Sequence, residues 1–263
     1  MGVTVETHAS LAEAARAVEA GATLIAGGTI VMRRVNAGDQ RLTRIVRVAD
    51  PAFARISGGG GTISIGAGAT MAAIAAHRDL DFLAPVARQL GGPALRNMAT
   101  IGGNLFARAP YGDMAVALLA LGARVTGTSG ARPVEDLLRA RDRAGLVFAI
   151  EVPRPRPGEF AWAKITRVHP YGSPVLTIAV HAPREGGRLR GVRVAFGGMG
   201  PGPVRATGAE RALEGQPLDA ATIARAAQAA AEGLEPVDDA VASAWYRREV
   251  AGVHLRRVLE GMS

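Results

Sequence analysis

TIGGN (Thr100–Asn104) and AGGT (Ala26–Thr29) are two glycine-rich turns that each set a threonine beside paired glycines. Glycine lacks a Cβ, so such a turn lets the backbone come close to a ligand and point its N–H groups at phosphate oxygens. One turn alone would mean little, because the chain has 34 glycines in 263 residues. The two turns together predict that a pyrophosphate is bound from both sides.

The two turns have different flanks. We expect a strand over 23–26 and a helix over 30–35 around the first turn. That places the turn at a helix N-terminus, where the helix dipole favours anions. Residues 96–108, around the second turn, show little periodicity, so we expect an extended loop there.

Composition limits the chemistry that this chain can perform alone. It has no cysteine, which excludes disulfides, thiolate zinc sites, a cysteine nucleophile and iron–sulfur ligation by its own residues. Redox chemistry would therefore need an organic cofactor. No apolar run is long enough to span a membrane and the N-terminus does not resemble a signal peptide, so we expect a cytoplasmic protein.

The chain is basic, with a formal net charge of +8. Its basic residues are spread along the whole length and only 4% of residues are aromatic, which argues against nucleic-acid binding and favours an acidic partner subunit. Lys164 is the only lysine among 31 basic residues. Either its presence has no functional meaning in an arginine-rich composition, or its compact charge has a role that arginine cannot fill.

The pattern of elements changes along the chain. We expect helices over 11–20, 71–76, 114–121 and 134–140, and strands over 44–48, 62–65, 123–126 and 146–152. Three strands of one antiparallel sheet, over 160–168, 175–182 and 189–196, precede helices over 208–213, 220–233 and 241–259. With a flexible glycine break at 58–61 and a proline-rich linker at 153–157, the expected domains are 1–57, 58–157 and 158–263.

Other candidate motifs are weaker. The GAGATM segment at 66–71 imitates a dinucleotide-binding turn, but Met71 replaces the third glycine, so we interpret it as a strand-to-helix turn. The histidines have no metal-ligand spacing, and we predict neither a metal site nor a catalytic side chain. Asp238 and Asp239 precede a helix, which suits caps. Asp113 is either a helix cap or a carboxylate for the hydroxyls of a bound nucleotide.

Taken together, three motifs resemble the FAD-binding subunit of the molybdenum hydroxylases, a family that includes the medium subunit of carbon monoxide dehydrogenase and the FAD-binding subunit of xanthine dehydrogenase. They are Ala26–Thr29, Thr100–Asn104, and Pro110-Tyr111-Gly112-Asp113. Lys164 lies where the family often has a lysine after an aromatic-rich strand, and Ile150–Pro153 resembles a family strand end.

The resemblance implies a vanillyl-alcohol-oxidase-like (PCMH-type) α+β fold: two α/β subdomains, then a C-terminal domain with a three-stranded antiparallel sheet and a helical bundle. It implies FAD, with the pyrophosphate on both glycine turns, sugar or ribityl hydroxyls on Asp113, and Lys164 towards the isoalloxazine end. The expected cofactor-binding residues are Leu24, Ile25, Ala26, Gly27, Gly28, Thr29, Ile30, Leu90, Thr100, Ile101, Gly102, Gly103, Asn104, Asp113, Val147 and Lys164.

The resemblance also implies a function: an electron-transfer subunit within a hetero-oligomer. A partner with 2Fe–2S clusters and a large molybdopterin subunit would complete the complex, and NAD, oxygen or a quinone would accept the electrons. The substrate, whether carbon monoxide, an aldehyde or a purine, is left open. Two alternatives remain, a stand-alone flavoprotein oxidoreductase of the same fold and a scaffold subunit that has lost FAD.

Overall fold

A computed structural model describes residues 2–59 and 61–263, which form two compact units. Of these described residues, the first unit contains those up to 107 and those from 124 to 152, and the second contains 108–123 and 153–263. The chain thus leaves the first unit at residue 108, contributes one helix to the second, and returns at residue 124. The expected division into 1–57, 58–157 and 158–263 stays a prediction.

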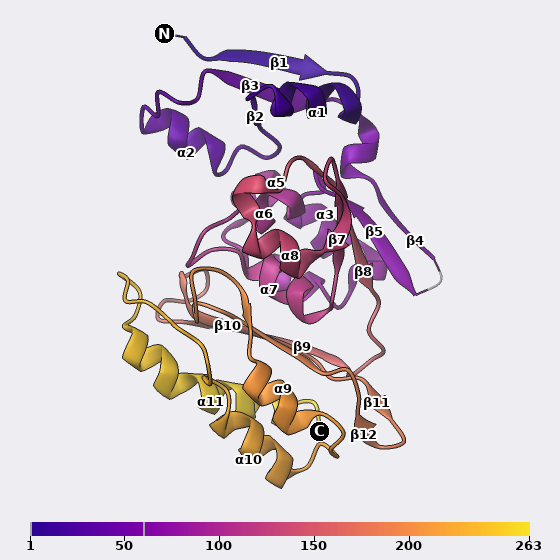
Figure 1. Cartoon of the computed structure of the whole chain (residues 1–263), viewed down its shortest axis with the longest axis vertical. Helices are drawn as coiled ribbons and strands as arrows, with labels where there is room; N and C mark the ends of the chain where they lie inside the picture. Colours follow the sequence, from indigo (N-terminus) through magenta and orange to yellow (C-terminus); the bar gives the residue numbers. More distant parts are fainter. Residues whose placement is uncertain (1, 60) are drawn as a thin grey trace. The chain divides into compact units, whose positions relative to one another are not determined.

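The first unit begins with a small parallel sheet, in the strand order β1-β3-β2, against which α1 packs (Figure 1). Its elements are β1 (Thr4–His8), α1 (Leu11–Glu19), β2 (Thr23–Leu24), α2 (Val31–Asn36) and β3 (Arg44–Val48). Ser10 starts α1 with a capping box, since its side chain accepts from the Glu13 N–H while the Glu13 carboxylate accepts from the Ser10 N–H. The expected helix over 11–20 and strand over 44–48 are confirmed.

A second sheet of the first unit has five strands, in the order β4-β5-β8-β6-β7. They are β4 (Ile56–Gly59), β5 (Thr62–Gly66), β6 (Arg124–Gly127), β7 (Gly130–Pro133) and β8 (Val147–Pro153). Gly58 and Gly59 belong to β4, where they pair with Ile63 and Thr62 of β5. The expected flexible break is therefore wrong for these two residues, because the ladder of an antiparallel hairpin holds them; Gly60 lies outside the described residues.

Short helices complete the first unit: α3 (Met71–Ala76), α4 (Ala84–Arg88), α5 (Pro93–Met98), α6 (Ile101–Leu105) and α8 (Val134–Arg139), with 3-10 turns at Pro51–Ala54, Arg78–Leu80 and Arg141–Arg143. The expected extended loop over 96–108 is wrong, because α5 and α6 occupy most of it. Thr100 caps α6, and Ile101 and Leu105 are buried one turn apart. A five-residue helix with two glycines is too short to show helical periodicity in the sequence.

The second unit is built on one antiparallel sheet in the strand order β14-β13-β10-β9. Its elements are α7 (Asp113–Ala120), β9 (Phe160–Thr166), β10 (Pro174–His181), β11 (Arg184–Glu185), β12 (Arg188–Leu189), β13 (Arg193–Gly197), β14 (Val204–Arg205), α9 (Thr207–Leu213), α10 (Ala220–Gln228) and α11 (Ala244–Glu260). The sheet has four strands rather than three. Leu189 belongs to the small β11–β12 hairpin, because the chain turns at Gly191, whose φ is +67°, before β13 begins.

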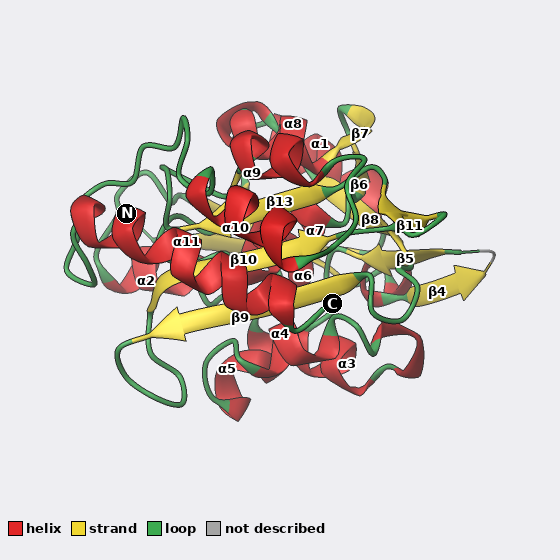
Figure 2. Cartoon of the chain, turned by 90° about the horizontal axis from the view of Figure 1, so that it is seen from below, coloured by secondary structure: helices red, strands yellow, loops and turns green. Residues whose placement is uncertain are grey.

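Helices cover both faces of this sheet. Helices α9, α10 and α11 lie over one face of the sheet (Figure 2). They share a buried apolar core with alternate residues of β10 and β13, among them Ile178 and Phe196. Helix α7 packs against β10, β13 and β14 on the other face, where a Cβ at Gly197 would collide with both Thr177 and Val116. All eight residues of α7 are buried. The second unit is therefore a three-layer arrangement with its sheet in the middle.

Candidate functional site

The first glycine turn leaves its backbone donors without a partner. The chain runs out of β2, donates the Ile25 N–H to the Val46 oxygen at 2.8 Å, and turns at Gly28, whose φ of +74° favours glycine. Helix α2 follows. Within residues 2–59 and 61–263, the N–H groups of Gly27, Gly28 and Thr29 have no acceptor. These donors are half-buried, so the turn can offer them to an anion.

Gly27 brings the first turn against the second one. A Cβ built on Gly27 would overlap the Met98 carbonyl, and it would lie 3.3 Å from Ala99 Cα. Met98 ends α5 and is two residues before Thr100. The glycine is thus required by the close approach of two backbone segments, one of which leads directly into the second turn. The binding of a pyrophosphate by both turns stays a prediction.

The second turn, unlike the first, uses its own N–H groups internally. Gly103 donates to Thr100 Oγ1 at 3.1 Å, and Asn104 donates to the Thr100 carbonyl at 3.0 Å. Ile101 and Gly102 donate to the carbonyls of Ala69 and Ala67, each at 2.9 Å. Each of these four N–H groups already has an acceptor in the protein, so it could contact a phosphate only through a hydrogen bond shared with that acceptor.

The GAGATM segment supports the second turn. It is the strand-to-helix turn that the sequence predicts, between β5 and α3, with Thr70 as the cap of α3. Besides accepting from α6, it donates from Met71 to the Ala99 carbonyl at 2.8 Å and from Ala67 to the Phe148 carbonyl at 2.9 Å. A Cβ on Gly102 would approach Ala67 to 2.8 Å, so this glycine permits the contact. This supporting role was not predicted from the sequence.

The other predicted residues of the first unit lie in separate local environments. Leu24 packs into the small core beneath α1, and Ile30 is the exposed residue before α2. Val147 is the buried first residue of β8, next to Phe148. Leu90 lies in the connection between α4 and α5, with its N–H bonded to Ala87. No hydrogen bond in the described residues joins Leu90 to either turn.

Asp113 and Lys164 form a buried ion pair in the second unit. Lys164 Nζ lies 2.8 Å from Asp113 Oδ2, and the two side chains are only 6% and 4% exposed. Gly112, with a φ of +106°, occupies the cap position of α7, so Asp113 is the first helical residue and its side chain caps nothing. The cap interpretation of Asp113 is therefore wrong. The lone lysine is the partner of the carboxylate that the sequence singled out.

One oxygen of this pair has no partner. Asp113 Oδ1 is buried and accepts no hydrogen bond within the described residues. Burial raises the pKa of the Asp113 carboxyl above its usual range, and the Lys164 ammonium opposes that rise. A buried carboxylate oxygen without a donor is unfavourable in the protein alone, so it is suited to a hydroxyl or N–H of a ligand.

The two aspartates before α11 have structural roles. Asp238 Oδ1 accepts from the Ala244 N–H at 2.6 Å, at the start of the helix, while Ser243 is the cap residue. Asp239 instead binds the buried Arg247 guanidinium through both oxygens, at 2.8 and 2.9 Å. The cap prediction is thus confirmed for Asp238 and wrong for Asp239.

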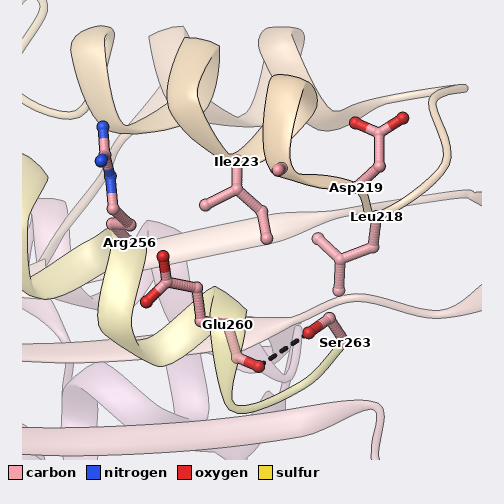
Figure 3. Close-up of a pocket in the computed structure, with 7 residues that line it drawn as sticks. Leu218, Asp219, Ile223, Arg256, Glu260 and Ser263 are labelled. Atoms are coloured by element: carbon pink, nitrogen blue, oxygen red, sulfur yellow. Dashed lines mark hydrogen bonds between the residues drawn. The ribbon is translucent and has the colours of Figure 1, made fainter.

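A hollow of about 340 Å³ lies between α10 and α11 of the second unit (Figure 3). Two of its polar side chains already have partners. Asp219 accepts from the Thr222 N–H at 2.8 Å, and the Ser263 hydroxyl donates to the Glu260 carbonyl at 2.7 Å. The hollow therefore offers helix caps and chain-end contacts, and we assign it no ligand.

Two further properties concern only the part of the chain that the structure describes. No group of three or more histidine, cysteine, aspartate or glutamate side chains in it could hold a metal ion. None of its helices combines the length and the apolar character needed to cross a membrane.

Comparisons with known proteins cover nearly the whole chain. The family described as FAD binding domain in molybdopterin dehydrogenase matches residues 2–155, and the CO dehydrogenase flavoprotein C-terminal domain matches residues 171–262. The 6-hydroxypseudooxynicotine dehydrogenase complex subunit alpha of Paenarthrobacter nicotinovorans is 30% identical over 253 residues, 90% of this chain and 86% of that protein. The glyceraldehyde dehydrogenase medium chain of Sulfolobus acidocaldarius is 30% identical, over 63% of this chain and 62% of that protein.

A solved structure has the same fold. A chain of the reconstituted CO dehydrogenase from Oligotropha carboxidovorans superimposes with a TM-score of 0.89 at 26% identity, covering 99% of this chain and 97% of that one. The expected fold class is confirmed by this likeness and by the two family matches.

Proposed function

This chain belongs to the family of FAD-binding domains of molybdopterin dehydrogenases, and from that premise we propose that it is the electron-transfer flavin subunit of a molybdenum hydroxylase complex. Its cofactor is FAD, as the resemblance implied, and its relatives are subunits of oxidoreductases. The observation that carries the proposal is that the N–H groups of Gly27, Gly28 and Thr29 have no acceptor in the described residues. The turn that holds them packs through Gly27 against the segment that leads into the second turn.

The residues of the first unit fit the pyrophosphate of FAD. Three unpartnered N–H groups in one turn before a helix are donors for an anion, and the Thr29 hydroxyl adds a fourth donor to the same turn. We assign the pyrophosphate chiefly to this turn. The second turn then holds the first in place through the contact of Met98 and Ala99 with Gly27.

The residues of the second unit fit the hydroxyl-bearing and flavin parts of the cofactor. Asp113 Oδ1 would accept from a sugar or ribityl hydroxyl, because its other oxygen is already bound to Lys164. The Lys164 ammonium would lie towards the isoalloxazine end and would be held in place by the carboxylate. Bound FAD would supply reversible one- or two-electron transfer.

This chain has no cysteine with which to hold a cluster, so an iron–sulfur cluster that delivers electrons to the flavin would belong to a partner. We propose that a 2Fe–2S subunit and a molybdopterin subunit complete the hetero-oligomer, and that NAD, oxygen or a quinone accepts the electrons. The net charge of +8 favours an acidic docking surface on the partner. The description of one relative as the subunit of a dehydrogenase complex supports this arrangement. A cytoplasmic location stays a prediction.

Native purification of the tagged chain from its own host tests the proposal. We expect one FAD per chain, together with molybdenum, iron and two further polypeptides in fixed ratio. Anaerobic addition of the substrate of that complex should bleach the flavin band only while the partners are attached. A chain that retains FAD without iron or molybdenum, and that oxidises a substrate alone, would contradict the proposal and favour a stand-alone oxidoreductase.

A further inference from the structure

Trp162 carries a second orphaned polar atom in the second unit. Its indole Nε1 is buried and finds no acceptor within the described residues. An N–H group that loses water on folding and gains no partner is unfavourable, and native proteins keep such groups rare. A buried donor of this kind therefore points to an acceptor that the chain does not supply.

The strand register shows which face of the sheet Trp162 belongs to. Trp162 of β9 pairs with Ala179 of β10, and Lys164 pairs with Thr177. Thr177 faces α7, since it lies beside Gly197 together with Val116. Alternate residues of β9, Ala161 and Ile165, pack instead into the core beneath α9, α10 and α11. Trp162 and Lys164 thus share the α7 face, roughly 7 Å apart along the strand.

Helix α7 packs mainly against the inner strands of the sheet. It packs against β10, β13 and β14, whereas β9 is the edge strand of the sheet. Lys164 reaches from β9 to Asp113 at the start of α7, and the free Asp113 Oδ1 lies at this bridge. One unpartnered donor and one unpartnered acceptor, both buried, therefore belong to the same face of the second unit. Asp113 is 4% exposed, so solvent does not satisfy its free oxygen.

We propose that Trp162 is a cofactor-positioning residue whose indole N–H donates a hydrogen bond to the riboflavin half of FAD, next to the group that donates to Asp113 Oδ1. The inference rests on the proposed function. A ligand at this face must present an acceptor and a donor close together. The ribityl hydroxyls and the pyrimidine edge of the flavin both do so, and the Lys164 ammonium beside Asp113 suits the flavin carbonyls.

Binding to the apoprotein of the full chain tests this inference, with FAD, riboflavin and ADP as separate probes. Trp162→Phe removes the N–H and keeps an aromatic ring, and the matched control is Trp245→Phe, because Trp245 is 69% exposed. We expect Trp162→Phe to weaken the binding of FAD and of riboflavin by about fivefold to tenfold, which corresponds to one hydrogen bond, and to leave the affinity for ADP unchanged. The control should bind all three probes like the original chain.

Fluorescence gives a readout that does not depend on the Trp162 variant folding. The chain has two tryptophans, so Trp245→Phe leaves Trp162 as the only emitter. Riboflavin should quench and shift this emission, and ADP should not. Unchanged affinities in a folded Trp162→Phe variant, or an effect confined to ADP, would overturn the inference while FAD binding stands. Failure of the original chain to bind FAD or riboflavin would overturn the proposed function itself.

Discussion

The two glycine turns have nearly the same composition, and the structure uses them differently. The first turn, Ala26–Thr29, keeps three N–H groups without an acceptor in the described residues. The second, Thr100–Asn104, donates its N–H groups to its own cap and to the 66–70 turn. Paired glycines therefore have two physical uses, presenting donors to a ligand and permitting backbones to pack. The sequence motif alone does not distinguish them.

The largest effect should come from Gly27, where the two turns meet. In Gly27→Ala the new Cβ overlaps the Met98 carbonyl, so one backbone segment must move. We expect the free energy of unfolding in urea to fall by about 4 kcal/mol, above the usual cost of overpacking, and FAD to be lost. Gly59→Ala is the control, since nothing lies within 4 Å of its added Cβ. Equal stability of the two variants would contradict the contact between the turns.

The side-chain pair of the second unit provides a comparison with these backbone contacts. Lys164→Met leaves the Asp113 carboxyl buried without its cation, which should cost about 3 kcal/mol of unfolding free energy. The double variant Asp113→Asn/Lys164→Met should lose clearly less than the sum of the single losses, measured in a double-mutant cycle. Additive losses would mean that the two side chains do not interact, and that the site lacks the charge pair proposed for it.

The two glycines of the second turn should differ from each other. In Gly102→Ala the added Cβ comes too close to Ala67, and this overpacking should lower the free energy of unfolding by about 2 kcal/mol. Gly103→Ala meets only Thr100 Oγ1, at 3.1 Å, and should change the unfolding free energy by less than about 1 kcal/mol. Thermal or urea unfolding decides the order. A costlier Gly103→Ala would show that the packing surface of this turn has been wrongly assigned.

The smallest effects should separate the two threonines. Thr100→Val removes the cap oxygen that accepts from Gly103, and about 1 kcal/mol of unfolding free energy should be lost. The Thr29 hydroxyl makes no hydrogen bond in the described residues, so Thr29→Val should leave stability unchanged and weaken the binding of FAD about fivefold. The roles assigned to the two turns would be contradicted if Thr100→Val weakened FAD binding without loss of stability. They would also be contradicted if Thr29→Val lowered stability without weakening FAD binding.

The elements that could be predicted from sequence have local causes. Helix α1 is marked by Ser10 and Glu13 at the spacing of a capping box, and β3 by a short apolar run. Helix α6 was missed because its stability comes from Thr100 and from the partners of Ile101 and Gly102 on the 66–70 turn. Those partners are distant in the chain, and neither propensity nor periodicity reports them.

The candidate site was predictable in its residues and only partly in its roles. The glycine turns, Asp113 and Lys164 could be chosen from motifs, but the 2.8 Å pairing of Asp113 with Lys164 depends on packing between α7 and the sheet. Trp162 was missed although a signal existed, because it lies two residues before Lys164 and side chains two apart share a face of a strand. Its orphaned N–H becomes visible only once the strand is folded.

Hydrogen–deuterium exchange of the two turns, with and without FAD, separates the turn that binds phosphate from the turn that packs. We expect amides of 26–31 to exchange fast in the apoprotein and to become protected by FAD but not by riboflavin, which lacks the pyrophosphate. Amides of 100–105 should be protected in both states, because the chain already accepts their hydrogen bonds. Protection that FAD induces only at 100–105, with 26–31 unchanged, would contradict the assignment of the pyrophosphate to the first turn.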